Sequence, residues 1–220
     1  MSVPVEAAIF DMDGVLVDSN PLHRHVWDVF NRGYSLETTE EMHRRMCGKR
    51  NDQIVRDLFG DELSDHEVAA RGRAKEALYR KLAGAQLEVI LVPGVRKFLQ
   101  KYHNLPKAIA TNAEPENVNF LLDGAGLRPF FDVVVDGHQV ERPKPSPDIY
   151  LKAAELLGVA PAACVVFEDS HSGVEAAWAA GMTVIGLTTT EVNLPRTTLT
   201  VDNFLSRHLE LWLEAQIRPV

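Results

Sequence analysis

Carboxylate, hydroxyl and lysine side chains occur in this sequence directly after short apolar segments. The first segment ends in Ala8-Ile9-Phe10 and is followed by Asp11, Asp13 and Gly14. A spacing of two residues at the end of a strand puts both carboxylates on the same side. Paired carboxylates can act as a nucleophile and as a general acid or base. Five further polar residues follow later apolar segments: Thr111, Asn112, Lys144, Glu168 and Asp169.

The apolar segments indicate the framework that brings these residues together. The segments are short, rich in β-branched and aromatic residues, and not interrupted by polar residues, as expected of strands buried on both faces. Between them, four segments have the periodicity of helices. The strands are expected at 5–10, 108–110, 133–135, 165–167 and 183–187, and the helices at 94–103, 114–125, 147–157 and 171–180.

Strands that alternate with helices predict an α/β fold with a doubly wound, mostly parallel sheet and right-handed crossovers. Ligands bind beyond the carboxyl ends of the strands in such sheets. The polar residues that follow the strands are therefore expected to converge on one edge. Ser146-Pro147 is expected to begin the third of these helices. A last helix is expected at 203–216, with Leu205, Leu209 and Trp212 on one face.

One interval departs from the alternation. Residues 20–91 contain helical periodicity but no convincing strand, and one helix is expected to bury Ala70, Ala74, Leu78 and Leu82. About 70 residues are too many for one crossover helix. We therefore expect a small all-helical domain at 20–91, inserted into an α/β core made of residues 1–19 and 92–220.

The predicted edge concentrates negative charge. Asp11, Asp13, Glu168 and Asp169 cannot all be ionised within a few ångströms of one another without compensation. A hard divalent cation would compensate them, and oxygen ligands suit Mg²⁺. Lys144, held between Pro143 and Pro145, adds a positive charge. Such a site suits an anionic substrate, above all a phosphate.

Bulk properties narrow the class of protein. Among 220 residues, 23 are basic and 31 acidic, which gives a net charge of −8 and argues against nucleic-acid binding. No segment approaches the roughly 20 apolar residues of a membrane span, and no secretory signal begins the chain. Cys47 and Cys164 are too few for a disulfide framework. We expect a cytoplasmic protein that is a monomer or a weak dimer, with no membrane partner.

The motif Asp11-Met12-Asp13-Gly14-Val15, followed in order by Thr111, Lys144 and Glu168-Asp169, resembles the haloacid dehalogenase superfamily of phosphohydrolases and phosphomutases. The helical insertion is similar to the cap domain of its subclass I. Within the superfamily the chain looks nearest to the β-phosphoglucomutase and phosphoglycolate phosphatase-like group. The resemblance covers residues 5–187.

The resemblance implies a role for each matching residue. Asp11 resembles the nucleophile that forms an aspartyl-phosphate, and Asp13 resembles the general acid and base. Mg²⁺ would be held by the carboxylates of Asp11 and Asp169 and by the Asp13 backbone carbonyl. Glu168 would either support its neighbours or act as an alternate ligand. The phosphate would be bound by Thr111, Asn112 and Lys144.

Several residues of the insertion are candidates for substrate contact. His23 resembles a histidine found near the active-site entrance in related enzymes, and Lys49 and Arg50 lie at the expected start of a helix. A surface or packing role is an open alternative for each. Lys75 resembles a lysine used by some sugar-phosphate mutases, but among Arg71, Arg73 and Arg80 we expect it to be solvated.

We therefore expect a Mg²⁺-dependent phosphatase of a small phosphorylated metabolite, such as a sugar phosphate or phosphoglycolate. A β-phosphoglucomutase-like mutase is the main alternative, but Glu114 and Asn51 replace the lysine and arginine that would hold its second phosphate. A receiver domain that accepts phosphate on aspartate would lack the helical insertion. A dehalogenase would not need a metal.

Overall fold

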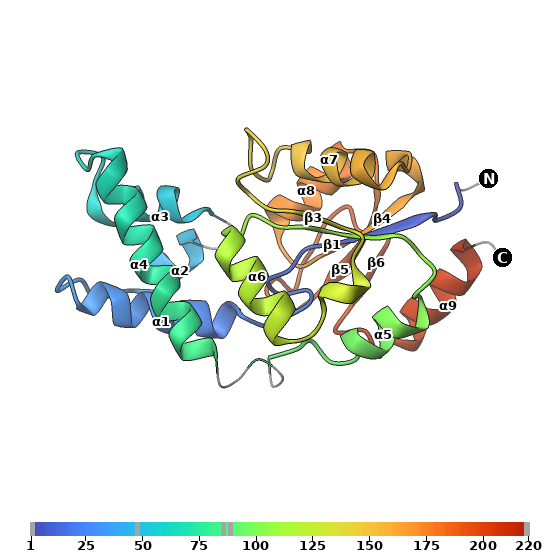
Figure 1. Ribbon diagram of the computed structural model, residues 1–220, viewed down its shortest axis with the longest axis horizontal. Helices are drawn as coiled ribbons and strands as arrows, with labels where there is room; N and C mark the ends of the chain where they lie inside the picture. Colours follow the sequence, from blue (N-terminus) through green and yellow to red (C-terminus); the bar gives the residue numbers. More distant parts are fainter. Residues whose placement is uncertain (1–2, 47–48, 85–86, 88–89, 218–220) are drawn as a thin grey trace.

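The computed structural model describes residues 3–46, 49–84, 87 and 90–217, so Cys47 lies outside it. Within these residues, six strands form a fully parallel sheet in the order β3-β2-β1-β4-β5-β6 (Figure 1). This arrangement confirms the predicted α/β class. The strands are β1 (Ala7–Phe10), β2 (Lys107–Ala110), β3 (Val133–Val135), β4 (Cys164–Glu168), β5 (Thr183–Leu187) and β6 (Leu199–Val201).

Strand β6 was not predicted. It has three residues at the edge of the sheet, and only Val201 is buried. Its sequence, Leu199-Thr200-Val201, is interrupted by an exposed threonine and lacks the apolar run by which the other five strands can be identified.

Among the described residues, five α-helices cover the two faces of the sheet (Figure 1). Helices α5 (Val95–Lys101), α6 (Pro115–Gly124) and α9 (Arg207–Gln216) pack on the face that buries Phe10 and Phe167. Helices α7 (Asp148–Leu157) and α8 (His171–Ala179) pack on the face that buries Ile9 and Val166. Successive strand residues point to opposite faces, which explains why both faces of the central strands are apolar.

The remaining four helices follow β1 and stand apart from the sheet (Figure 1). They are α1 (Asn20–Arg32), α2 (Glu40–Met46), α3 (Asn51–Phe59) and α4 (Asp65–Ala83). They enclose an apolar cluster of their own, which includes Trp27, Ile54 and Val68. The helical character of this insertion agrees with the sequence analysis, and its domain limits at residues 20 and 91 stay predictions.

The buried face of α4 differs from the predicted one. Ala74 is exposed, and Ala70, Leu78 and Leu82 are half-buried. The buried side chains lie one position away and include two charged residues, so a search for apolar spacing finds the wrong face. The buried face consists of Val68, Gly72, Lys75, Glu76, Tyr79 and Ala83.

The start of the last helix also differs from expectation. Helix α9 begins at Arg207, because the Ser206 side chain accepts the backbone N–H of Leu209, and it buries Leu209 and Leu213. Leu205 therefore precedes the helix and is exposed. Two further helical turns are short 3-10 helices at Arg128–Phe130 and Pro161–Ala163.

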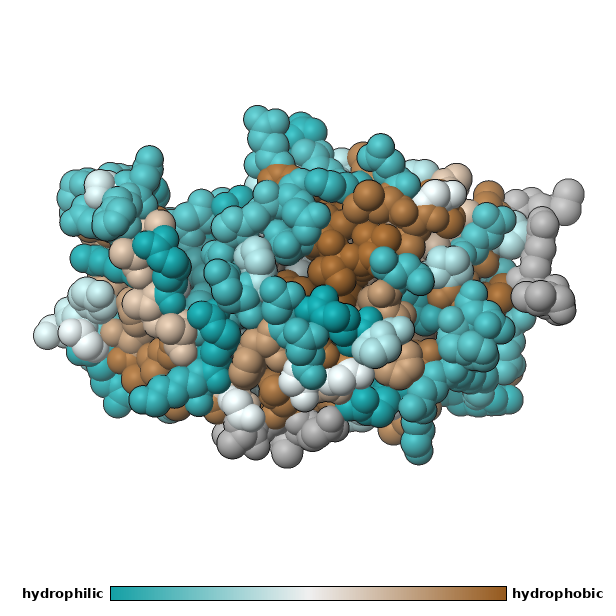
Figure 2. All heavy atoms as spheres, viewed as in Figure 1, coloured by the Kyte–Doolittle hydropathy of each residue, from teal (hydrophilic) through white to brown (hydrophobic). Residues whose placement is uncertain are grey.

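The surface of the described residues is mostly hydrophilic on the face shown in Figure 2, with hydrophobic side chains gathered over the middle of the α/β part. None of the described helices is long and apolar enough to cross a membrane.

The packing of α6 on the sheet gives a prediction about stability. Leu121 is 2% exposed in the cluster that covers one sheet face, whereas Leu156 on α7 is 54% exposed. Leu121→Ala should lower the free energy of unfolding by about 2–5 kcal/mol, because it removes buried methyl groups and leaves a cavity. The matched change Leu156→Ala should stay within about 0.5 kcal/mol of the wild type in the same urea titration. Equal effects of the two changes would contradict this packing.

Candidate active site

Asp11 leaves the sheet at its centre, directly after β1. Its backbone N–H donates to the carbonyl of Phe167 on the neighbouring strand β4, 3.0 Å away. This bond continues the pairing of β1 with β4 by one residue and brings Asp11 next to Glu168. The Asp11 side chain accepts a hydrogen bond from Lys144 Nζ at 2.6 Å and is only 7% exposed.

Gly14 allows the chain to turn back after Asp13. Its φ of +81° lies in the left-handed region, where a side chain is strained. A Cβ atom at this position would lie 1.7 Å from Asp169 Oδ2. Glycine is therefore required twice, by the backbone conformation and by the close approach of Asp169. Both requirements agree with the tight turn predicted from the sequence.

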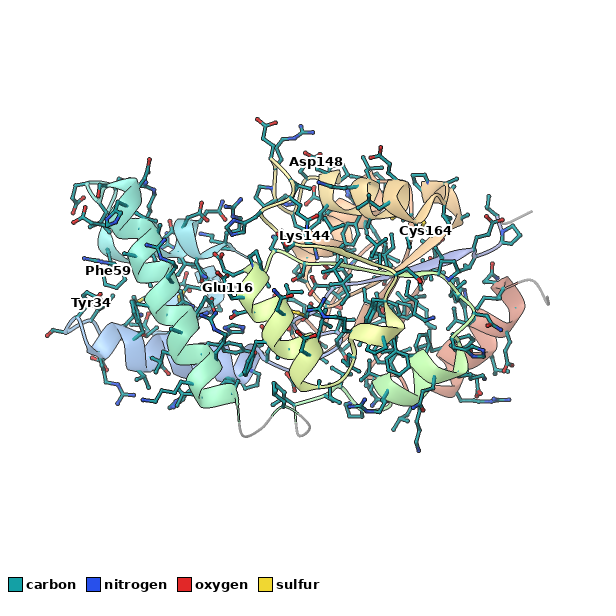
Figure 3. All side chains as sticks on the ribbon, in the orientation of Figure 1. Tyr34, Phe59, Glu116, Lys144, Asp148 and Cys164 are labelled. Atoms are coloured by element: carbon teal, nitrogen blue, oxygen red, sulfur yellow. The ribbon has the colours of Figure 1, made fainter. Side chains whose placement is uncertain are left out.

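Lys144 is buried between two carboxylates. It reaches the site from the loop between β3 and α7, and Figure 3 shows it on the side of the sheet nearest the helical insertion. Its Nζ donates to Asp11 Oδ1 at 2.6 Å and to Glu168 Oε1 at 2.7 Å. Burial alone would lower the pKa of Lys144, but the two carboxylates raise it above its usual range. The lysine is therefore a fixed positive charge.

Glu168 has donors on both of its oxygens. Tyr150 donates to Oε1 at 2.7 Å, and Oε2 accepts the backbone N–H groups of Asp169 and Ser170 at 2.9 and 3.0 Å. Burial by itself raises the pKa of Glu168, but Lys144 and these donors lower it by more, so that the pKa lies below its usual value. Glu168 is thus a buried anion that holds Lys144, which fits a supporting role.

The first turn of α8 is shaped to accept Glu168. Ser170 caps the helix by accepting the N–H of Gly173 at 3.1 Å. A Cβ on Gly173 would lie 1.6 Å from Glu168 Oε1, so only glycine leaves room for the carboxylate. The capping by Ser170 is present together with the charged site. Ser146, by contrast, does not cap α7, because that helix begins at Asp148 after Pro147.

Asp11 and Asp169 are poor anions in the protein alone. Burial raises the pKa of Asp11 to about 7, although Lys144 opposes the shift. Burial and the nearby charges of Glu168 and Asp11 raise the pKa of Asp169 well above its usual range. Burial is the largest cause of both pKa shifts, and too little positive charge faces these carboxylates to offset it.

A divalent cation fits this deficit. Asp11 and Asp169 offer carboxylate oxygens beside the Asp13 backbone, and hard oxygen donors are the ligands that Mg²⁺ prefers. Among the described residues, no group of three His, Cys, Asp or Glu side chains is arranged to hold a metal ion. Mg²⁺ usually keeps several water ligands, so two side chains and a backbone carbonyl are a sufficient protein contribution.

Asp13 faces the helical insertion. Ser19 donates a short hydrogen bond to its Oδ1, and His23 Nε2 lies 3.6 Å from the same oxygen. Burial by itself raises the pKa of Asp13, but the interactions with His23, Ser19 and Lys75 lower it overall. His23 therefore lies at the site. Of the two roles left open for it, contact with a substrate and a surface or packing role, this position favours the first.

The expectation that Lys75 is solvated is wrong. Lys75 is 2% exposed and donates to Glu76 Oε1 at 2.7 Å, and its Nζ lies 2.8 Å from His23 Nδ1. The neighbouring Arg71 and Arg73 suggested a charged surface. The signal that was missed is the spacing Val68, Lys75, Tyr79, which places Lys75 on the buried face of α4.

Glu76 links the insertion to the core. Its Oε1 also accepts Asn51 Nδ2 at 2.7 Å, and its Oε2 accepts Asn117 Nδ2 from α6. Arg80 Nη1 donates to Asn117 Oδ1 at 2.8 Å. Helices α4 and α6, far apart in sequence, are thus joined by buried polar contacts.

The predicted phosphate-binding residues lie beside Lys144. Thr111 is buried, and its Oγ1 accepts the N–H of Ala113 at 3.2 Å. Asn112 Oδ1 lies 3.5 Å from the backbone nitrogen of Lys144. Both residues line the cavity into which Asp11 and Lys144 face.

This cavity has a volume of about 530 Å³ and lies between the sheet edge and the insertion. Lys49 and Arg50 line it, but each is paired with a carboxylate of its own helix region, Asp57 at 2.6 Å and Asp52 at 3.3 Å. Their contact with a substrate stays a prediction.

Four residues of the site were not identified from the sequence. Thr189 and Thr190 belong to the run Thr188-Thr189-Thr190 that follows β5, so the rule that selected residues after the other strands would also have selected them. Ser19 and Asn20 stand at the start of α1 and gave no distinct signal.

The chain is similar in sequence to known proteins. The family model of haloacid dehalogenase-like hydrolases matches residues 5–181. A phosphorylated carbohydrates phosphatase from Thermotoga maritima is 38% identical over 181 residues, which cover 81% of this chain and 82% of that protein. A beta-phosphoglucomutase from Bacillus subtilis is 27% identical over 191 residues, or 83% of each chain.

The fold is also similar to that of a solved structure. The crystal structure of a HAD hydrolase of family IA, variant 3, from Entamoeba histolytica matches with a TM-score of 0.85 and 30% sequence identity. The match covers 96% of this chain and 98% of that chain.

The close approach of Glu168 to α8 gives one prediction. Gly173→Ala should displace the Glu168 carboxylate and destabilise the protein by about 1–3 kcal/mol in urea titrations, because its Cβ overlaps a buried anion. Gly72→Ala is the control, since its Cβ meets no atom closer than 3.4 Å and alanine favours a helix. A Gly173→Ala protein as stable as the control would contradict the packing.

The raised pKa of Asp11 gives a second prediction. Between its ordinary pKa of 3.8 and the folded-state value of about 7, the folded protein binds more protons than the unfolded chain. In chelator, stability should therefore fall as pH rises across this range. Asp11→Asn should flatten part of that slope, and Mg²⁺ should raise the melting temperature more at pH 8 than at pH 5. A stabilisation by Mg²⁺ that does not depend on pH would contradict the assignment.

Proposed function

This chain belongs to the haloacid dehalogenase-like hydrolase family, and we propose that it is a Mg²⁺-dependent phosphatase of small phosphorylated sugars. The family and the fold confirm the resemblance stated from the sequence. The observation that carries the proposal is the buried contact of Lys144 with both Asp11 and Glu168, which fixes a carboxylate and a positive charge at one wall of a cavity.

Asp11 is the proposed nucleophile. One of its oxygens attacks the phosphorus of the substrate, the bond from phosphorus to the leaving alcohol oxygen breaks, and an aspartyl-phosphate forms. The non-bridging oxygens of the phosphoryl group carry negative charge in this step. Lys144, Thr111 and Asn112 line the same cavity as Asp11 and are the proposed groups that stabilise this negative charge.

Asp13 is the proposed general acid and base. It gives a proton to the leaving oxygen, and later takes one from the water that attacks phosphorus and releases Asp11 and inorganic phosphate. The lowered pKa of Asp13 means that the free protein holds it as an anion. The negative charge of an arriving phosphate raises the pKa of a nearby carboxyl, which favours uptake of the proton that the first step needs.

Asp11, Asp169 and the Asp13 carbonyl are the proposed Mg²⁺ ligands. When bound, the ion supplies positive charge that stabilises the transferring phosphoryl group and keeps Asp11 ionised. Residues of the chain have the other proposed roles: they bind the phosphate, position the nucleophile and transfer the proton.

The choice of phosphatase over mutase depends on the positions that would bind a second phosphate. A mutase must bind a second phosphate there. Asn51 instead donates to the Glu76 carboxylate, and Lys75 is neutralised by the same group. Glu114, at the other candidate position, is itself an anion and pairs with His138 at 2.7 Å. The described residues therefore offer no strong clamp for a second phosphate at these positions, which supports water as the final acceptor.

The name of the Thermotoga maritima relative supports a carbohydrate phosphate as the substrate. A cavity of about 530 Å³ is large enough for such a molecule. Residues from α1, α2, α3 and α4 line the cavity, so the insertion is the proposed source of substrate specificity.

A phosphate-release assay tests the function. The purified protein should release inorganic phosphate from at least one member of a panel of sugar phosphates when Mg²⁺ is present, and lose this activity in EDTA. Asp11→Asn should reduce turnover by several orders of magnitude, because an amide cannot act as the nucleophile. Asp61→Asn, the same change at an exposed position, is the control.

The products decide between the two reactions. The protein is supplied with β-glucose 1-phosphate and a trace of the 1,6-bisphosphate, and both products are followed. Glucose 6-phosphate should not form faster than free phosphate. Faster formation of glucose 6-phosphate would make the protein a mutase. Turnover by Asp11→Asn at the wild-type rate would remove Asp11 from its proposed role.

A further inference from the structure

The carboxylate of Asp169 is held by donors on only one of its oxygens. Thr190 Oγ1 makes a short hydrogen bond to Oδ2, and Asn20 Nδ2 lies 3.4 Å from the same atom. Thr189 Oγ1 lies 3.5 Å from Oδ2 but makes its closer hydrogen bond to the Gly14 carbonyl. None of the described residues donates a hydrogen bond to Oδ1.

The direction of these hydrogen bonds follows from the chemistry of the groups. Asn20 Nδ2 also makes a short hydrogen bond to Thr190 Oγ1. An amide nitrogen only donates, so the Thr190 oxygen accepts this bond and its own proton is left for Asp169. Asn20, Thr190 and Asp169 therefore form a directed chain of hydrogen bonds that ends on Oδ2.

The space around Oδ2 is closed as well. This atom lies against Gly14, where an added Cβ would be 1.7 Å away. Asp169 is 3% exposed and lines the cavity shared with Asp11. With Oδ2 turned toward Gly14 and Thr190, Oδ1 is the oxygen left for a ligand in the cavity.

We infer that Thr190 and Asn20 restrict Asp169 to binding a cation through one oxygen, and that this makes the site prefer Mg²⁺ to Ca²⁺. The inference rests on the proposed role of Asp169 as a Mg²⁺ ligand. Mg²⁺ takes six ligands in a tight octahedron, whereas Ca²⁺ takes six to eight and often binds both oxygens of a carboxylate. Binding through both oxygens would require Oδ2 to leave its donors.

Thr190→Val removes the hydroxyl at nearly constant volume. The metal-free wild type and variant are titrated with MgCl₂ and with CaCl₂ in a calorimeter, without substrate. We expect the Mg²⁺ dissociation constant to rise about 10-fold, the usual effect of removing a hydrogen bond to a metal ligand. The Ca²⁺ constant should rise much less, because the freed Oδ2 can then bind Ca²⁺. The preference for Mg²⁺ should therefore fall several-fold.

Two variants serve as matched controls. Thr188→Val makes the same change two residues earlier, where the hydroxyl donates to Asp202 at 2.9 Å instead, and should leave the ratio of the two constants unchanged. Thr190→Ser keeps the hydroxyl and should restore most of the preference. Asn20→Ala, which removes the first donor of the chain, should lower the preference in the same direction and decides the matter if Thr190→Val does not fold.

The outcomes separate this inference from the proposed function. If the wild type binds Mg²⁺ and both Thr190→Val and Asn20→Ala keep the wild-type ratio, the inference is wrong and the proposed phosphatase activity stands. If the wild type binds neither ion, the proposed metal site and this inference are both wrong.

Discussion

The ion pair of Lys144 with Asp11 and Glu168 is the interaction on which the rest of the site depends. Three buried charges are destabilising unless each has partners, because an unpaired charge in a protein interior is strongly unfavourable. The three charges are one another's partners and come from separate parts of the chain. Asp11 follows β1, Glu168 ends β4, and Lys144 comes from the loop after β3. The neighbouring positions of β1 and β4 in the sheet are what make the arrangement possible.

Two glycines and two hydroxyl-bearing residues contact Glu168 of this ion pair and its neighbour Asp169. Gly173 leaves room for Glu168, and Gly14 leaves room for Asp169, so each buried carboxylate lies where any other residue would collide with it. Tyr150 and Thr190 then supply donors to the same carboxylates. The backbone thus determines the position of each carboxylate, and hydroxyl groups from neighbouring elements determine its orientation.

The sequence predicts the fold and the sheet edge well because both depend on short-range patterns. Five uninterrupted apolar runs identify five strands, and the rule that ligands bind beyond their carboxyl ends selects Asp11, Lys144 and Glu168 together. The structure brings these three side chains into contact. Thr190 follows the fifth run and satisfies the same rule, although it is not among the residues predicted from the sequence.

The insertion was harder to predict because its buried face is partly charged. Lys75 and Glu76 lie on the inner side of α4, where they compensate each other and bind Asn51 and Asn117. No apolar periodicity indicates such a face, because burial here is made possible by pairing between side chains that are distant in sequence. A lysine among arginines looks solvated until the position of its partners is known.

The start of α1 connects the insertion to the chemistry of the edge. Ser19 donates to Asp13, and Asn20, the next residue, donates to Asp169 and Thr190. One turn later, His23 lies 3.6 Å from Asp13 and 2.8 Å from Lys75 on α4. The same helix turn therefore contacts the proposed acid, a proposed metal ligand and the polar centre of the insertion. A shift of α1 against the sheet must change the hydrogen bonds of both Asp13 and Asp169. In the proposed mechanism, contacts of the insertion with the leaving group are thus coupled to the proton donor and to the metal site through a single helix end.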